Sequence, residues 1–225
     1  EAGWTGLVVL EAKDRSVWHH VHLSGANEVR RGGWLASGGV NFYHSPAELR
    51  SSSISDARGE DALNILGAEF LLDELRIFDT VSDAFDGDFV TGLVRKCEFT
   101  RIGGDGVDTS GSELTVERCT FTEVLDKAIS GGESSQLVVT GGVVRSASIG
   151  VASKDGSTVE VTGLKIQSAT HYGMTAYIKK PEYPPSRITA DGVELGETGR
   201  GPYLAQTGCE IVADGTAQPT QDVDV

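Results

Sequence analysis

Apolar and polar residues alternate in short stretches that recur along the chain every 22 or 23 residues. Alternation with a period of two is typical of β-strands that bury one side. A repeat of 22 residues is too short for a strand–helix–strand unit, which needs about 30 residues. One apolar position per repeat lies 22 or 23 residues from the next: Ile54, Ile77, Phe99, Phe121, Val144 and Ile166. The pattern predicts a β-solenoid in which each coil has one strand that contains the apolar residue of this series.

The repeat also predicts the handedness and size of the solenoid. Leu23 and Leu195 extend the series with gaps of 31 and 29 residues, which indicates an insertion in each flanking coil. Strands one coil apart run parallel, and such crossovers are right-handed in about 98% of cases. The sequence therefore predicts an all-β, right-handed parallel β-helix of about eight coils with 22–23-residue repeats. Around Leu23 the alternation predicts Val17 inside and Trp18 outside.

The pattern divides the chain into three parts. Residues 17–212 carry the repeat and form the predicted parallel β-helix. Residues 1–16 are expected to supply a first strand, Gly6–Leu10, at a truncated N-terminal edge. A bare sheet edge implies a covering partner, so we expect an upstream domain of the same protein. Residues 213–225 lack a core pattern and are predicted to form a polar tail.

Composition and charge narrow the classes of partner. Glycine is abundant, with 29 residues, whereas proline is scarce, with 6, as expected for tight turns between strands that need every N–H group. A net charge of −14 argues against nucleic acid, anionic membranes and polyanionic polysaccharides as partners. No apolar run approaches the roughly 20 residues of a membrane helix, so no membrane insertion is expected.

The three cysteines are too few for a disulfide-rich scaffold. Cys97 and Cys119 occupy equivalent places in successive repeats and alternate with Phe99 and Phe121. The repeat therefore predicts that the two side chains are buried neighbours. They are expected to be free core thiols or, alternatively, a strained disulfide between coils.

Acidic residues recur with the same period and predict two columns along one side of the solenoid. The first column consists of Asp61, Asp83, Asp105 and Asp126. The second, three residues later, consists of Asn41, Asn64, Asp86, Asp108, Ser130 and Ala152. Two carboxylates about 5 Å apart repel by roughly 3 kcal/mol at an effective dielectric constant of 20. Such columns need turn N–H groups, shared protons or a bound cation, and the sequence leaves all three open.

Two kinds of catalytic site are compatible with these residues. Asp83, Asp86, Asp105 and Asp108 are candidate catalytic carboxylates and, alternatively, candidate ligands for Ca²⁺. A glycosidase that inverts configuration would need two carboxyl groups about 6.5–9.5 Å apart. A lyase would instead need a base, for which Lys127 is the candidate, and a cation to neutralise a uronate carboxylate.

Candidate binding residues lie in the two long coils. Tyr177, Lys179 and Tyr183 belong to the later insertion, where two prolines after Tyr183 indicate a rigid loop that walls a binding surface. Trp34 lies in the earlier insertion, and its ring is suited to stack on a sugar. The alternative for all four residues is an ordinary solvated surface.

The period, the Asn- and Asp-rich turns and two phrases carry a family resemblance. Residues 103–108 (Gly-Gly-Asp-Gly-Val-Asp) and 148–155 (Ser-Ile-Gly-Val-Ala-Ser-Lys-Asp) resemble right-handed β-helix repeat proteins of the pectate-lyase-like superfamily, and the resemblance covers residues 17–212. The superfamily includes lyases, hydrolases, epimerases, adhesins and non-catalytic binding modules, so the resemblance implies the fold but no single activity. Polygalacturonase-type members place aspartates from adjacent coils around the scissile bond. The chain lacks the Gly-His-Gly and Arg-Ile-Lys segments of those hydrolases.

These observations lead to one expectation and two alternatives. We expect a secreted or cell-surface β-helix module that recognises a polysaccharide or glycan along its acidic face. The first alternative is a Ca²⁺-dependent polysaccharide lyase or a glycoside hydrolase, and the second is a structural spacer within a larger surface protein. The sequence leaves open whether the protein is catalytic.

Overall fold

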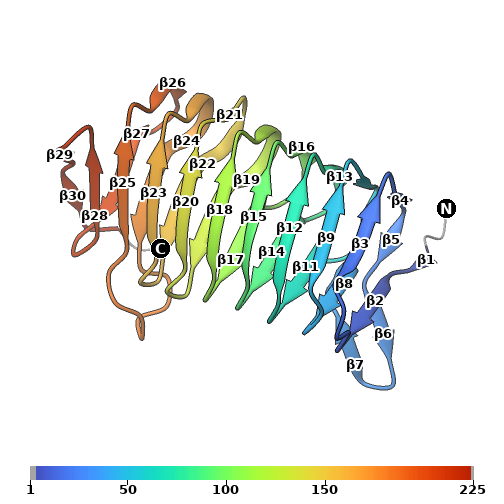
Figure 1. Cartoon of the computed structure of the whole chain (residues 1–225). Helices are drawn as coiled ribbons and strands as arrows, with labels where there is room; N and C mark the ends of the chain where they lie inside the picture. Colours follow the sequence, from blue (N-terminus) through green and yellow to red (C-terminus); the bar gives the residue numbers. More distant parts are fainter. Residues whose placement is uncertain (1–3, 224–225) are drawn as a thin grey trace.

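The computed structural model describes residues 4–223. These residues form a right-handed parallel β-solenoid of about nine turns with a spacing of about 23 residues. In Figure 1 the coils stack side by side, from the blue N-terminal strands at the right to the red C-terminal strands at the left. The predicted fold class is confirmed. Among the described residues no helix is long and apolar enough to cross a membrane.

Each turn of the solenoid has three faces. Face 1 carries the acidic columns. Its strands are β2 (Leu7–Leu10), β8 (Gly38–Tyr43), β11 (Asp61–Leu66), β14 (Asp83–Asp88), β17 (Val107–Ser110), the second halves of β19 (Thr120–Gly132) and β24 (Lys165–Tyr177), β22 (Ala147–Lys154), β27 (Gly201–Gln206) and β30 (Thr220–Gln221).

Face 2 follows face 1 in every turn. Its strands are β3 (Ser16–His19), β9 (Ala47–Arg50), β12 (Glu69–Asp73), β15 (Thr91–Arg95), β18 (Glu113–Glu117), β20 (Gln136–Thr140), β23 (Thr158–Thr162), β25 (Arg187–Asp191), β28 (Glu210–Ala213) and β29 (Thr216–Ala217). All neighbours on this face pair in parallel except β28 and β29, which are antiparallel.

Face 3 closes each turn. Its strands are β4 (His22–Ser24), β10 (Ser53–Ser55), β13 (Arg76–Thr80), β16 (Glu98–Ile102), β21 (Val143–Val144), β26 (Glu194–Thr198) and the first halves of β19 and β24. Because β19 and β24 run continuously from face 3 into face 1, these two faces form one sheet.

The predicted apolar series forms the inner side of face 3. Each member lies in register with its equivalent one coil away, from Leu23 with Ile54 to Ile166 with Leu195. The rings of Phe99 and Phe121 stack with their centroids 4.9 Å apart and their planes 5° apart. The solenoid has about nine turns rather than eight because β27 and β28 add a turn beyond this series.

The corner between faces 1 and 2 has a repeating backbone. In six successive coils, from β8 to β22, the residue after the end of the face 1 strand turns the chain with a positive φ between 48° and 61°. This corner consists of His44, Gly67, Phe89, Gly111, Glu133 and Asp155. The left-handed conformation bends the chain sharply, so face 1 ends at the same place in successive coils.

Two insertions lengthen the predicted coils. The first forms the antiparallel hairpin β6 (Val29–Arg31) and β7 (Trp34–Ala36), and is preceded by β5 (Ala26–Asn27), which pairs with β1 (Trp4–Thr5). The second is the loop 178–186 between β24 and β25. Both extend below the body of the solenoid in Figure 1, at opposite ends.

Several local expectations are settled by this arrangement. The outward orientation predicted for Trp18 is wrong, because Trp18 pairs with the buried Leu49 and packs on Phe42, with ring centroids 5.4 Å apart. Cys97 and Cys119 are buried free thiols. The expected first part, 1–16, contains β1 and β2, and the expected tail, 213–225, contains β29 and β30. Residues 1–3 and 224–225 lie outside the described part of the chain.

Candidate functional site

The outward positions of face 1 form three columns, because parallel strands in register place equivalent residues side by side. The first consists of Gly38, Asp61, Asp83, Asp105, Lys127 and Ile149. The second consists of Asn41, Asn64, Asp86, Asp108, Ser130, Ala152 and Thr175. The third consists of Tyr43, Leu66, Asp88, Ser110, Gly132, Lys154 and Tyr177.

The predicted second column is confirmed from Asn41 to Ala152. In the first column the prediction for Asp126 is wrong. The register between β17 and β19 pairs Val107 with Ile129, so Lys127 occupies the place that follows Asp105. The Asp126 side chain is 52% exposed and lies beside the column.

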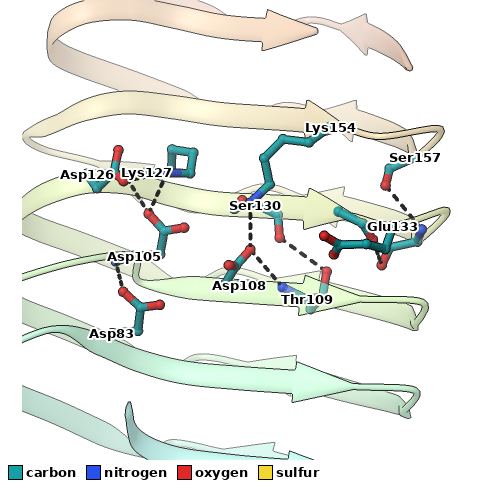
Figure 2. Close-up of polar contacts among 12 residues, drawn as sticks. Asp83, Asp105, Asp108, Thr109, Asp126, Lys127, Ser130, Glu133, Lys154 and Ser157 are labelled. Atoms are coloured by element: carbon teal, nitrogen blue, oxygen red, sulfur yellow. Dashed lines mark hydrogen bonds and ion pairs between the residues drawn. The ribbon is translucent and has the colours of Figure 1, made fainter. Parts of the chain in front are cut away.

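Eight charged residues of face 1 and its edge form what we call the acid–lysine surface: Asp61, Asp83, Asp86, Asp88, Asp105, Asp108, Lys127 and Lys154. Its acids lie mainly in the earlier coils and its lysines in the later ones, as Figure 2 shows for Asp83, Asp105, Lys127 and Lys154. The surface therefore brings together all five residues that the sequence predicted as catalytic.

Three of these carboxylates lie very close together. Asp83, Asp105 and Asp108 each place an oxygen within 4.8 Å of the others. Each pair of charges would repel by roughly 3.5 kcal/mol at an effective dielectric constant of 20. Repulsion of this size must be offset locally, and the described residues offset it in three ways: backbone N–H groups, ammonium groups and protonation.

Backbone N–H groups support the first column. Asp83 Oδ1 accepts a hydrogen bond of 2.7 Å from the N–H of Asp105, and Asp105 Oδ1 accepts one of 2.8 Å from the N–H of Lys127. Each carboxylate is thus bonded to the next coil (Figure 2). In the second column Asn64 Nδ2 donates to Asp86 Oδ2 at 2.9 Å.

Two buried lysines supply positive charge. Lys127 Nζ lies 3.1 Å from Asp105 Oδ1 and 2.5 Å from Asp126 Oδ2. Lys154 extends across face 1 to place its Nζ 3.3 Å from Asp108 Oδ1 (Figure 2). Both lysines are only 8% exposed. Burial lowers the pKa of each ammonium group, but the neighbouring carboxylates outweigh burial, so both pKa values are raised.

Protonation relieves the remaining repulsion. Burial, followed by the charges of Asp61, Asp88, Asp108 and Asp83, raises the pKa of Asp86 to about 9. Burial also raises the pKa values of Asp61 and Asp105 to about 7, although Lys127 acts in the opposite direction on Asp105. At neutral pH this surface therefore contains at least one carboxylic acid able to donate a proton.

Two buried hydroxyls on the same face lack a hydrogen-bond partner among the described residues. They are Ser130 Oγ and Thr175 Oγ1, in residues that are 0% and 1% exposed. Buried polar groups of this kind are uncommon in folded proteins. Together with the clustered charges, they mark face 1 as a surface that is not optimised for stability alone.

The residues suited to a divalent cation are Asp83, Asp105 and Asp108. Oxygen ligands of this kind suit Ca²⁺. However, Lys127 and Lys154 already contact Asp105 and Asp108, so a cation would have to compete with two ammonium groups. The arrangement favours lysines as the resident counter-ions, and Ca²⁺ stays a prediction.

The predicted binding residues are distributed over both ends of face 1. Tyr177 pairs with Lys154 in the third column, and burial raises its pKa. Lys179 is exposed on the adjoining loop, which also contains the half-buried Tyr183. Trp34 lies at the other end, on the β6–β7 hairpin, with its ring centroid 6.3 Å from that of Tyr43.

The loop 178–186 is anchored beside the surface. The N–H groups of Lys179 and Lys180 donate to Asp155 Oδ1 at 2.6 and 2.7 Å. The Lys180 side chain forms an ion pair with Glu133. These contacts hold the loop against the corner that follows face 1.

Three residues of the acid–lysine surface, Asp61, Asp88 and Lys154, are not among the five candidate catalytic residues. Asp61 does belong to the first column that the period predicts, because it lies 22 residues before Asp83. Lys154 has the same kind of signal, because it lies three steps of 22 residues after Asp88.

Comparison with models of protein families, with curated proteins and with solved structures finds no match to this chain. Its function must therefore be inferred from the fold and from the geometry of face 1.

Proposed function

We propose that face 1 binds a neutral polysaccharide and cleaves it, with Asp86 as general acid and Asp108 as nucleophile. The observation that carries this proposal is their register: Asp86 pairs directly with Asp108 on neighbouring strands, whose backbones lie about 4.8 Å apart. Retaining glycosidases hold their two carboxyl groups about 5–5.5 Å apart, whereas inverting enzymes need about 6.5–9.5 Å. The register favours retention over the inverting geometry that the sequence left open as one possibility.

The two carboxyl groups have different surroundings, as their roles require. Asp86 lies among four other acids and has a pKa raised to about 9 by burial and by their charges. It therefore carries a proton at neutral pH, which a general acid must donate to the departing sugar oxygen. Asp108 Oδ1 accepts hydrogen bonds from Lys154 Nζ and the Thr109 N–H. Both contacts use Oδ1, so Oδ2 is left to face a sugar carbon.

Charge supports a neutral substrate. A lyase needs an unengaged cation beside the uronate carboxylate, but Lys127 and Lys154 are already paired with aspartates. The net charge of −14 also disfavours a polyanion. A Ca²⁺-dependent lyase is therefore the less supported alternative.

We extend the proposal to family and location. The three-faced right-handed coil and the resemblance of residues 103–108 and 148–155 support membership of the pectate-lyase-like superfamily. A polysaccharide substrate supports a secreted or cell-surface location, since such polymers remain outside the cell. A spacer within a larger surface protein would use the same coils, but it has no need of the Asp86–Asp108 pair.

The test is an activity screen on neutral polysaccharides, with release of reducing ends as the readout. Asp86→Asn and Asp108→Asn should each lower the rate by at least about 100-fold, as expected for loss of acid or nucleophilic catalysis. Asp191→Asn, on the exposed side of face 2, is the matched control and should leave the rate unchanged. NMR of the first product should show retained configuration at the anomeric carbon.

Each other outcome has a defined meaning. Binding of a polysaccharide without cleavage would overturn catalysis and favour the recognition module expected from the sequence. Cleavage that survives both substitutions would place the reaction elsewhere. An inverted product would refute the assignment of Asp108 as nucleophile.

A further inference from the structure

Two rings at the corner between faces 1 and 2 lie directly on glycines of the next coil. A Cβ atom at Gly67 would lie 2.6 Å from His44 Nδ1, and one at Gly111 would lie 2.8 Å from Phe89 Cδ1. Because glycine has no Cβ atom, each glycine leaves room for the ring of the residue one coil earlier. Along the solenoid axis, rings and glycines alternate at this corner. We call the four residues the ring strip: His44, Gly67, Phe89 and Gly111.

Phe89 is held in an unfavourable position for an aromatic residue. Its φ is 52° and it is 68% exposed. The left-handed conformation disfavours any side chain with a Cβ atom, and a bulky residue there is a genuine outlier. The left-handed φ itself belongs to the corner and recurs at Glu133 and Asp155. The choice of an aromatic side chain is what the core does not explain, because the ring gains little from burial.

The spacing of the rings matches a repeating ligand. His44 and Phe89 lie two coils apart, which corresponds to about 10 Å. This is close to the length of two sugars in an extended β-1,4-linked glycan, in which alternate sugars present the same face to one side. Aromatic rings bind such faces through their C–H groups and their apolar surface.

The surroundings favour a neutral chain. Asp88 ends the strand that precedes Phe89, and Tyr43 ends the strand that precedes His44. These side chains offer hydrogen-bonding groups to sugar hydroxyls, while the net charge of −14 disfavours an anionic polymer.

We propose that the ring strip is a binding site for a neutral β-1,4-linked glycan, whose alternate sugars stack on His44 and Phe89. The inference rests on the proposed function for its carbohydrate ligand. It goes beyond that function because the strip lies at the corner, apart from the Asp86–Asp108 pair, and requires no catalysis.

The test is isothermal titration with cellohexaose, and with maltohexaose as the α-linked comparison. The wild-type protein should bind cellohexaose more tightly than maltohexaose. Phe89→Ala should weaken cellohexaose binding roughly 2- to 10-fold, the range expected for one aromatic contact, and Phe89→Trp should preserve it. The matched control is Phe78→Ala, which removes a half-buried ring on face 3 and should leave the affinity unchanged.

The results separate the strip from the catalytic proposal. Cellohexaose binding that depends on Phe89, together with no cleavage of any polysaccharide in the activity screen, would support the strip and overturn catalysis. Absence of cellohexaose binding, equal affinity for maltohexaose, or unchanged affinity in Phe89→Ala would overturn the strip, whether or not a polysaccharide is cleaved at Asp86 and Asp108.

Discussion

Replacing Asp86 by asparagine should stabilise the protein in a manner that depends on pH. The pKa of Asp86 is about 9 in the folded state, against an ordinary value of 3.8, because burial and four neighbouring acids oppose its ionisation. Between these values the folded state holds a proton that the unfolded state releases. The free energy of unfolding therefore falls as pH rises from about 4 to about 9.

The size of the effect follows from the pKa difference. Each unit corresponds to about 1.4 kcal/mol, so ionisation in the unfolded chain alone costs the wild-type protein up to about 4 kcal/mol at pH 7. Asparagine keeps the shape and an oxygen that accepts from Asn64 Nδ2, the present donor to Asp86, but it cannot ionise. Asp86→Asn should therefore be about 1–4 kcal/mol more stable than the wild type at pH 7 and about equal at pH 4.

Urea unfolding at pH 4, 6 and 8 would measure this difference, with Asp191→Asn as an exposed control. The control should show a small change at every pH, since exposed substitutions usually alter stability by less than about 0.5 kcal/mol. A gain in Asp86→Asn that is independent of pH, or a variant less stable than the wild type at pH 8, would refute the electrostatic account. A stabilised but inactive variant would show that the acid is retained for chemistry at the expense of stability.

Two further predictions concern the core and the lysines. Phe99→Ala should lower the free energy of unfolding by about 3–5 kcal/mol in urea titrations, because it removes a fully buried ring stacked on Phe121; an unchanged midpoint would contradict the stacking. Lys127→Met should destabilise the protein by about 3–5 kcal/mol by breaking a buried ion pair with Asp105, and millimolar Ca²⁺ should raise its melting temperature more than that of the wild type. An equal or larger Ca²⁺ response in the wild type would show that the lysines are not the resident counter-ions.

Much of the fold could be predicted from the sequence because the solenoid is nearly one-dimensional. Each strand pairs with its equivalents one coil away, so the spacing of 22 or 23 residues between successive members of the series from Ile54 to Ile166 already specifies the pairing register. The second column, from Asn41 to Ala152, follows from the same arithmetic and is confirmed by the strand pairing. The buried free thiols Cys97 and Cys119 also follow from it.

The sequence-based prediction was wrong at two positions. Asp126 was assigned to the first column because it is acidic, but it lies only 21 residues after Asp105. Lys127 lies 22 residues after Asp105, in agreement with the pairing of Val107 with Ile129. In the first coil Val17 and Trp18 are both apolar, so alternation could not decide that Trp18 is the one that packs on the core.

The amino-acid sequence by itself determined the coil, its period and the presence of an acidic side. Only the tertiary structure decided how the acids are compensated, because the partners lie far apart in the chain. Lys154 reaches Asp108 across 46 residues of sequence, and Asp86 is surrounded by acids from its own strand and from the two neighbouring strands. Charge interactions depend on distance and burial, which a spacing along the chain does not specify. The protonated Asp86 and the buried lysines therefore became visible only once the coils were stacked.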